Sequence, residues 1–167
     1  IKIEVIPRLK SIDSLLEKVF RPGKNYNNPY DEITDKIGLR FVVLLEKDIA
    51  TIGNVIESNN IWVFSKDKDF EDERINSPTL FDYQSRHYIL KNKMELKVDN
   101  IVIPQYTPCE IQIRTLLQHA YSELSHDTIY KPQTRITPET HRLVARSMAL
   151  IETTDQLFLE VNKMISS

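Results

Sequence analysis

Polar and apolar side chains alternate over a short segment in the second half of the chain. Glu110, Gln112 and Arg114 are separated by Ile111 and Ile113. Successive side chains of a strand point to opposite faces, so an acid, an amide and a guanidinium should share one face while the isoleucines face the core. A carboxylate on a rigid strand can hold Mg²⁺ and leave the rest of its shell to water and phosphate. The alternative is an exposed sheet face with ordinary Glu–Arg pairing.

A second acid, Asp35, stands just before an apolar stretch at residues 37–45 that contains a lone charge, Arg40. An unpaired cation inside a buried strand is costly, so Arg40 must meet a partner or point into a cleft. Asp35 and Glu110 together would suffice for a nucleotide-bound magnesium site. The alternative is an internal ion pair between Asp35 and Arg40, or between Arg40 and another acid.

Basic residues cluster near the start of the chain. Lys10, Ser14 and Lys18 are spaced by four, so on a helix they share one face. Together with Arg8 they form a short basic edge suited to a polyphosphate. The alternative is a solvated outer face of a helix, where charge is normal.

An aromatic ring, a hydroxyl and an imidazole recur at every second position from Tyr83 through Ser85 to His87. Strand alternation would put all three on one side. Such a face is suited to stacking on a nucleotide base and hydrogen bonding a phosphate. The alternative is a Tyr–His pair at a sheet surface.

These residues need a sheet to position them, and the hydrophobic pattern predicts one. Strand patterns occupy residues 1–6 (ended by Pro7), 37–45, 61–65, 83–91, 94–98 (as a hairpin partner of 83–91) and 109–114. Helical patterns occupy residues 11–20 (with a capping box at Ser14 and Glu17), 48–58, the segment from Thr115 onward, and 138–165. Loops are expected at residues 21–30 and at the highly charged residues 66–76. Strands mixed with helices predict an α/β or α+β sheet with helical cover.

The last helical pattern follows a break at Lys131-Pro132 and has one apolar side. That side consists of Leu143, Leu150, Leu157, Val161 and Met164. We expect residues 132–167 to form a helical extension that packs on the core, residues 1–131, or on a second subunit of a homo-oligomer.

Composition excludes several classes of protein. A net charge of −2 gives no global attraction to nucleic acid, so any affinity for phosphate must come from local clusters. The single cysteine, Cys109, excludes an internal disulfide and fits a reducing, cytoplasmic setting. No run approaches the roughly 18 apolar residues that a membrane span needs, so we expect no membrane partner.

Taken in order, these segments resemble the synthetase domain of the RelA/SpoT family, the enzymes that make the alarmones pppGpp and ppGpp. The matching pieces are Arg8-x-Lys10-Ser11 with Ser14 and Lys18, Asp35-x-x-Gly38-x-Arg40, Tyr83-Gln84-Ser85-x-His87, and Glu110-Ile-Gln-Ile-Arg-Thr115. Ala120-Tyr121, His126 and Tyr130-Lys131 are similar to the helix that closes the motif in small members. The likeness runs over residues 1–131.

The resemblance implies a nucleotidyltransferase-like mixed β-sheet flanked by helices. It also implies transfer of the β,γ-pyrophosphate of ATP to the ribose 3′-hydroxyl of GDP or GTP, with release of AMP. The implied ATP-binding residues are Arg8, Lys10, Ser14, Lys18 and Arg40. Asp35 and Glu110 are the implied ligands of Mg²⁺, with Glu110 also the general base. The implied GDP/GTP-binding residues are Tyr83, Ser85, His87, Gln112 and Arg114.

One departure from the family pattern lies beside the acceptor residues. Asp82 stands where many members have glycine, so backbone and phosphate contacts there are expected to differ, and the choice of acceptor stays open. One alternative is a toxic relative that uses an adenine nucleotide or the 3′ end of tRNA as acceptor. Another is an inactive module that binds nucleotides or partner proteins, although such a module has no reason to keep both Asp35 and Glu110.

Overall fold

A mixed β-sheet forms the centre of the computed structural model, which describes residues 3–126 and 137–166. Within these residues, five strands pair in the order β1-β2-β7-β4-β3. Their bounds are Ile3–Leu9 for β1, Ile37–Val43 for β2, Trp62–Lys68 for β3, Arg86–Asn92 for β4 and Pro108–Thr115 for β7. β2 and β7 run parallel, whereas the other neighbours are antiparallel. The outer strands β5 (Leu96–Val98) and β6 (Ile101–Ile103) form a separate two-stranded sheet.

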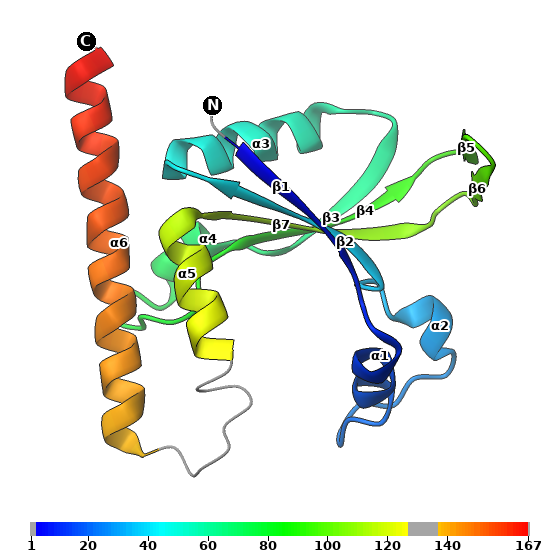
Figure 1. Cartoon of the computed structure of the whole chain (residues 1–167), viewed down its shortest axis with the longest axis horizontal. Helices are drawn as coiled ribbons and strands as arrows, with labels where there is room; N and C mark the ends of the chain where they lie inside the picture. The colour runs from blue at the N-terminus through cyan, green and yellow to red at the C-terminus, as the bar shows by residue number, and fades with distance from the viewer. Residues whose placement is uncertain (1–2, 127–136, 167) are drawn as a thin grey trace.

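The helices flank this sheet on both sides (Figure 1). They are α1 (Ile12–Val19), α2 (Pro29–Glu32), α3 (Glu46–Ser58), α4 (Phe70–Asn76), α5 (Leu116–Ser125) and α6 (Pro138–Ser166). In Figure 1 α3 lies above the sheet, whereas α1 and α5 lie below it, and α6 stands beside α5. The predicted α+β architecture, a mixed sheet flanked by helices with a long C-terminal helix, is confirmed. None of the helices in the described residues is long and apolar enough to cross a membrane.

The hydrophobic core lies between α3, α4 and one face of the sheet. Its buried members are Val43, Ile49, Ile52, Ile56, Phe70, Tyr88, Ile111 and Ile113. Burial of Ile111 and Ile113 in the hydrophobic core fixes the orientation of β7, because the period of a strand is two and a slip of one residue would turn the polar side chains toward that core instead. The alternation predicted for this strand is therefore confirmed, and its polar side chains occupy the opposite face.

Three expectations for the first fifty residues are wrong. Pro7 does not end β1, because β1 is an edge strand in which a missing N–H is tolerated, and Pro7 lies in register with Leu39. The cap of α1 is Ser11, whose hydroxyl accepts a hydrogen bond from the Ser14 N–H at 3.2 Å. The capping box predicted at Ser14 and Glu17 is therefore one turn too late. Residues 21–30 are not entirely loop either, because α2 begins at Pro29.

The charged residues 66–76 are not a loop. β3 extends to Lys68, and α4 follows immediately, with Asp69 as its N-cap. Charged residues of this segment form ion pairs with residues elsewhere in the chain. Asp69 pairs with Arg86 at 3.1 Å, and Arg74 pairs with Glu46 at 2.8 Å. The hairpin predicted between residues 83–91 and 94–98 does not form, because β5 pairs with β6 and not with β4.

The long C-terminal helix packs on α5 and α3, but not through the apolar side that the sequence predicted. Leu143, Leu150, Leu157, Val161 and Met164 all have exposed side chains. The residues that α6 buries are Met148 and Asp155. The predicted boundary between residues 131 and 132, like the Tyr130-Lys131 match, lies outside the described residues.

Candidate active site

Strand register brings the predicted site residues from distant segments into one row across the sheet. Gln112 on β7 lies opposite Arg40 on β2 and, on its other side, opposite His87 on β4. His87 in turn lies opposite Lys68 on β3. Residues in register on neighbouring strands present their side chains to the same face. Arg40, Gln112, His87 and Lys68 therefore form a polar row on the face opposite the core.

Glu110 stands next to this row. Its carboxylate accepts a hydrogen bond from the Gln112 side-chain amide at 2.9 Å. Burial raises the pKa of Glu110, and the neighbouring negative charge of Asp35 raises it further. Strands β2 and β7 lie very close together here. Gly38 pairs with Glu110, and a Cβ added at Gly38 would lie 2.9 Å from the Glu110 carbonyl oxygen. The glycine of the Asp35-x-x-Gly38 motif thus allows β2 to run tightly against the acid-bearing strand.

Asp35 lies just before β2 and is held by two residues of the predicted basic edge. Its carboxylate pairs with Lys10 at 3.0 Å and with Lys18 at 2.9 Å. Burial opposes ionisation of Asp35, but hydrogen bonds and charge from Lys18 and Lys10 outweigh it, so the pKa of Asp35 lies below its ordinary value. The ion pair considered between Asp35 and Arg40 does not form, since Arg40 bonds Glu123 on α5 at 3.0 Å.

The two acids fit a magnesium ion better than a transition metal. In residues 3–126 and 137–166 there is no group of three His, Cys, Asp or Glu side chains that could hold a metal ion. Asp35 and Glu110 offer only hard carboxylate oxygens, and they repel one another: after burial, the charge of Asp35 is the next largest cause of the raised pKa of Glu110. A divalent cation shared by the pair would relieve that repulsion, while phosphate and water would complete its shell.

Tyr83, Ser85 and His87 do meet, although β4 begins only at Arg86. The Tyr83 hydroxyl donates to the Ser85 hydroxyl at 3.0 Å and lies 3.3 Å from Nε2 of His87. Ser85 is fully buried, so its hydroxyl orients the Tyr83 ring and does not reach solvent. Burial, reinforced by the charges of Lys68 and Arg114, lowers the pKa of His87 to about 4. The imidazole is therefore neutral at physiological pH.

A pocket of about 260 Å³ opens on this face, and five of the predicted residues line it. The lining residues are Arg8, Arg40, Tyr83, Gln112, Arg114, Ser122, Glu123 and His126. Sequence reasoning missed Ser122 and Glu123, and it named His126 only as part of the segment that is similar to the closing helix of small family members. Their spacing was an available signal, because Ser122 and His126 are separated by one turn of α5, as are His119 and Glu123, which pair at 3.5 Å.

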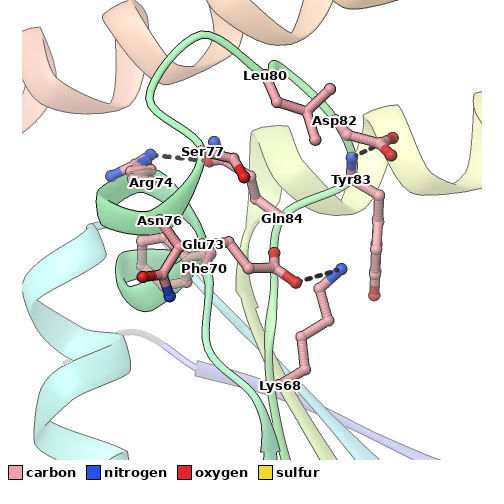
Figure 2. Close-up of a pocket in the computed structure, with 10 residues that line it drawn as sticks. All are labelled: Lys68, Phe70, Glu73, Arg74, Asn76, Ser77, Leu80, Asp82, Tyr83 and Gln84. Carbon is pink, nitrogen blue, oxygen red and sulfur yellow. Dashed lines mark hydrogen bonds and ion pairs between the residues drawn. The ribbon is translucent and has the colours of Figure 1, made fainter.

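A second pocket of about 270 Å³ lies behind the tyrosine, between α4 and the segment that leads into β4 (Figure 2). Lys68 and Glu73 point toward one another across it and pair at 3.3 Å. The Lys68 ammonium also lies 4.7 Å from the centre of the Tyr83 ring. Asp82, the departure from the family pattern, accepts a hydrogen bond from the Tyr83 N–H at 2.6 Å. Tyr83 thus lines both pockets, and Asp82 and Lys68 help to fix it.

The chain is similar to known proteins in sequence and in fold. The sequence model described as "Region found in RelA / SpoT proteins" matches residues 7–135. GTP pyrophosphokinase YwaC of Bacillus subtilis (strain 168) is 26% identical over 160 residues, which cover 95% of this chain and 72% of the relative.

Two solved structures from Bacillus subtilis have closely similar folds. Small alarmone synthetase 2 has 25% identity and a TM-score of 0.77, over 96% of this chain and 80% of that one. Small alarmone synthetase 1 bound to its product pppGpp has 20% identity and a TM-score of 0.77, over 98% and 79%. The family model covers most of the chain, including both acids of the site, and the protein therefore belongs to the RelA/SpoT family.

Proposed function

We propose that this protein is an alarmone synthetase that transfers the β,γ-pyrophosphate of ATP to the 3′-hydroxyl of GDP or GTP. The products are AMP and ppGpp or pppGpp. The observation that carries the proposal is the Asp35–Glu110 pair, which is flanked by cations on both sides. Lys10 and Lys18 lie beside Asp35, and Arg114 continues the face beyond Glu110. Relatives named GTP pyrophosphokinase and small alarmone synthetase support the same reaction.

ATP is assigned to the basic edge formed by β1, α1 and β2. Lys10 and Lys18 neutralise phosphate charge, and the guanidinium planes of Arg8 and Arg40 can stack on adenine. Ser14 accepts a hydrogen bond from Ser11, so its own O–H proton remains available for a phosphate oxygen. The two lysines that pair with Asp35 would then be shared between its carboxylate and the polyphosphate of ATP.

GDP or GTP is assigned to the tyrosine end of the same face. Tyr83 stacks on guanine, while Gln112, His87 and Arg114 order the ribose and the phosphates of the acceptor. Ser85 acts indirectly, by orienting the Tyr83 hydroxyl. A neutral His87 can donate one hydrogen bond and accept another, which suits a hydroxyl more than a phosphate.

The chemical step needs a proton acceptor beside the 3′-hydroxyl, and Glu110 is assigned that role. The 3′-oxygen bonds to the β-phosphorus of ATP, the bond between that phosphorus and the α,β-bridging oxygen breaks, and AMP leaves. The hydroxyl proton passes to Glu110, whose raised pKa makes it a better proton acceptor than an ordinary carboxylate. Mg²⁺ held by Asp35 and Glu110 would neutralise phosphate charge, and the rest of the rate enhancement comes from positioning.

The test is a transfer assay with ATP labelled in its β,γ-phosphates. The protein is incubated with Mg²⁺ and with GDP, GTP, ADP, AMP or tRNA as separate acceptors, with an EDTA-treated sample as the metal control. We expect label on GDP or GTP, and none after EDTA treatment. Label found only on an adenine nucleotide or tRNA would overturn the acceptor assignment. No transfer to any acceptor, with ATP still bound, would show that the chain is a binding module.

A further inference from the structure

Glu123 on α5 is an acid among cations. Its carboxylate lies 3.0 Å from Arg40 and 3.9 Å from Arg114, and it is also 3.5 Å from the His119 ring. Among the described residues that line this pocket it is the sole acid, whereas Arg8, Arg40 and Arg114 are all cations. Glu123 therefore bridges two arginines that come from different strands, β2 and β7.

Arg114 is the partner that most needs an anion. Its side chain is 1% exposed, and its Nε and Nη1 have no hydrogen-bond partner among the described residues. Among the described residues its side chain makes one hydrogen bond, to Gln112, and that bond is long at 3.4 Å. A buried guanidinium that lacks acceptors carries a large desolvation penalty. Such a group is prepared for a ligand that brings several acceptor oxygens.

Glu123 is only a weak partner for Arg114. Its side chain is 58% exposed, and it reaches Arg114 at the limit of an ion pair. An exposed carboxylate is well hydrated and loses little when it rotates into solvent. It can therefore leave the arginines when nucleotides bring an adenine ring to Arg40 and phosphate oxygens to Arg114.

We propose that Glu123 is a displaceable counterion that couples binding of the two nucleotides. This inference rests on the proposed function, in which Arg40 belongs to the ATP site and Arg114 to the acceptor site. Whichever nucleotide binds first must displace the carboxylate from both arginines, because one carboxylate bridges them. The second nucleotide then meets an arginine that is already released, and it binds more tightly than it would alone. By thermodynamic reciprocity the effect is the same in either order of binding.

Removing the carboxylate has two distinct consequences. Each nucleotide alone should bind more tightly, because no displacement is needed and the two arginines repel each other until an anion arrives. Coupling between the nucleotides should fall, because its source is gone. The pocket also becomes more positive, so nucleotide affinity should depend more steeply on ionic strength. A purely structural defect would weaken binding instead of tightening it.

The experiment compares wild-type protein with Glu123→Gln by isothermal titration calorimetry in Mg²⁺. The probes are GDP and α,β-methylene-ATP, whose bridge cannot break, each titrated alone and in the presence of the other, at low and high salt. We expect the variant to bind each probe alone roughly three- to tenfold more tightly, with a smaller coupling factor and a steeper salt dependence. Glu123→Asp, which keeps the charge on a shorter side chain, should fall between the two proteins.

Glu160→Gln, the same change at an exposed position on α6, is the matched control and should leave both affinities unchanged. Affinities in Glu123→Gln that are equal to wild type, or weaker, would overturn the inference. The transfer assay on the same preparations separates this result from the proposed function. If label moves to GDP but the affinities do not change, the counterion role fails and the function stands. If the affinities shift as expected but no acceptor is labelled, the function fails.

Discussion

Glu110 on β7 and Asp35 just before β2 are both carboxylates of the site, yet their surroundings shift their pKa values in opposite directions. Lys18 and Lys10 outweigh burial at Asp35, so its pKa is lowered. At Glu110 burial dominates and its pKa is raised. Two acids whose pKa values are driven apart are suited to different tasks. In the proposed reaction the anionic Asp35 would hold the metal, while Glu110 would take up the proton.

The first prediction concerns Glu110→Gln. The amide keeps the size of the side chain and can still bond Gln112, but it cannot accept the proton of the 3′-hydroxyl. We expect pyrophosphate transfer to fall roughly 10²- to 10⁴-fold. ATP affinity should change little, because the lysines and arginines assigned to ATP are untouched. Label transfer and calorimetric titration with α,β-methylene-ATP measure the two quantities separately.

Glu95→Gln, at an exposed position before β5, is the control for this prediction and should retain full transfer. Near-full activity in Glu110→Gln would mean that another group takes the proton. Equal loss of ATP affinity and of transfer would instead make Glu110 chiefly a metal ligand.

At the scale of elements, prediction from the sequence was most accurate where the pattern within a single strand determines which side chains face the core. The period of two along β7 was enough to assign Glu110, Gln112 and Arg114 to one face, because Ile111 and Ile113 must be buried. The same reasoning was less accurate at Tyr83, where regular pairing has not yet begun. There the cluster forms through the Tyr83 hydroxyl.

The wrong or missing predictions share a physical cause. Residues 66–76 looked like a loop because their charge suggested solvent, but Arg86 and Glu46 supply partners from distant segments. Glu123 was overlooked for the same reason: its partner Arg40 is 83 residues away. Periodicity within a segment reports which side chains share a face. It does not report which charges another element will neutralise.

Helix α6 is connected to the tyrosine segment by a polar bridge. Gln84, which follows Tyr83 directly, donates to Glu152 on α6 at 2.6 Å. Arg74 on α4 donates to Gln84 at 2.8 Å and pairs with Glu152 at 3.3 Å. Gln84 is 5% exposed, so these bonds are shielded from water and hold the backbone beside Tyr83 in place. Helix α6 thus supports the Tyr83 end of the site, which we assign to the acceptor.

The second prediction follows from this bridge. Glu152→Ala removes the acceptor of the Gln84 bond and should raise the KM for GDP roughly three- to tenfold. Affinity for α,β-methylene-ATP should stay unchanged, because Gln84 is not part of the basic edge. Glu152→Gln keeps an acceptor oxygen and should restore most of the GDP affinity. A parallel loss for both nucleotides in Glu152→Ala would indicate general destabilisation and contradict a role confined to the acceptor.

For the molecule as a whole, one buried acid ties α6 to the end of the central strand. Asp155 is 1% exposed and accepts a hydrogen bond from the Thr115 hydroxyl at 2.6 Å. Thr115 is also the N-cap of α5, where it forms a capping box with Gln118. β7, α5 and α6 therefore meet at one point. Burial raises the pKa of Asp155 to about 6, with a further contribution from Glu46, although the Thr115 hydrogen bond opposes it.

The third prediction is a pH dependence of stability that comes from Asp155. Its pKa in the folded protein, about 6, lies above the ordinary value of 3.8. Between these values the folded state holds a proton that the unfolded state has lost, so the free energy of unfolding falls as pH rises through this window. Asp155→Asn stays neutral and can still accept the Thr115 bond. The variant should gain stability over wild type from about pH 4 to about pH 6, by about 3 kcal/mol at most.

Urea unfolding of both proteins at several pH values measures this difference directly. His87 and Glu110 also have shifted pKa values, but they are present in both proteins and cancel in the comparison. Above about pH 7 the two curves should run parallel, because Asp155 is then ionised in both folded and unfolded wild-type protein. A stability difference that stays constant from about pH 4 upward would contradict the raised pKa. It would show instead that Asp155 contributes to the junction of β7, α5 and α6 through its hydrogen bond and not through its charge.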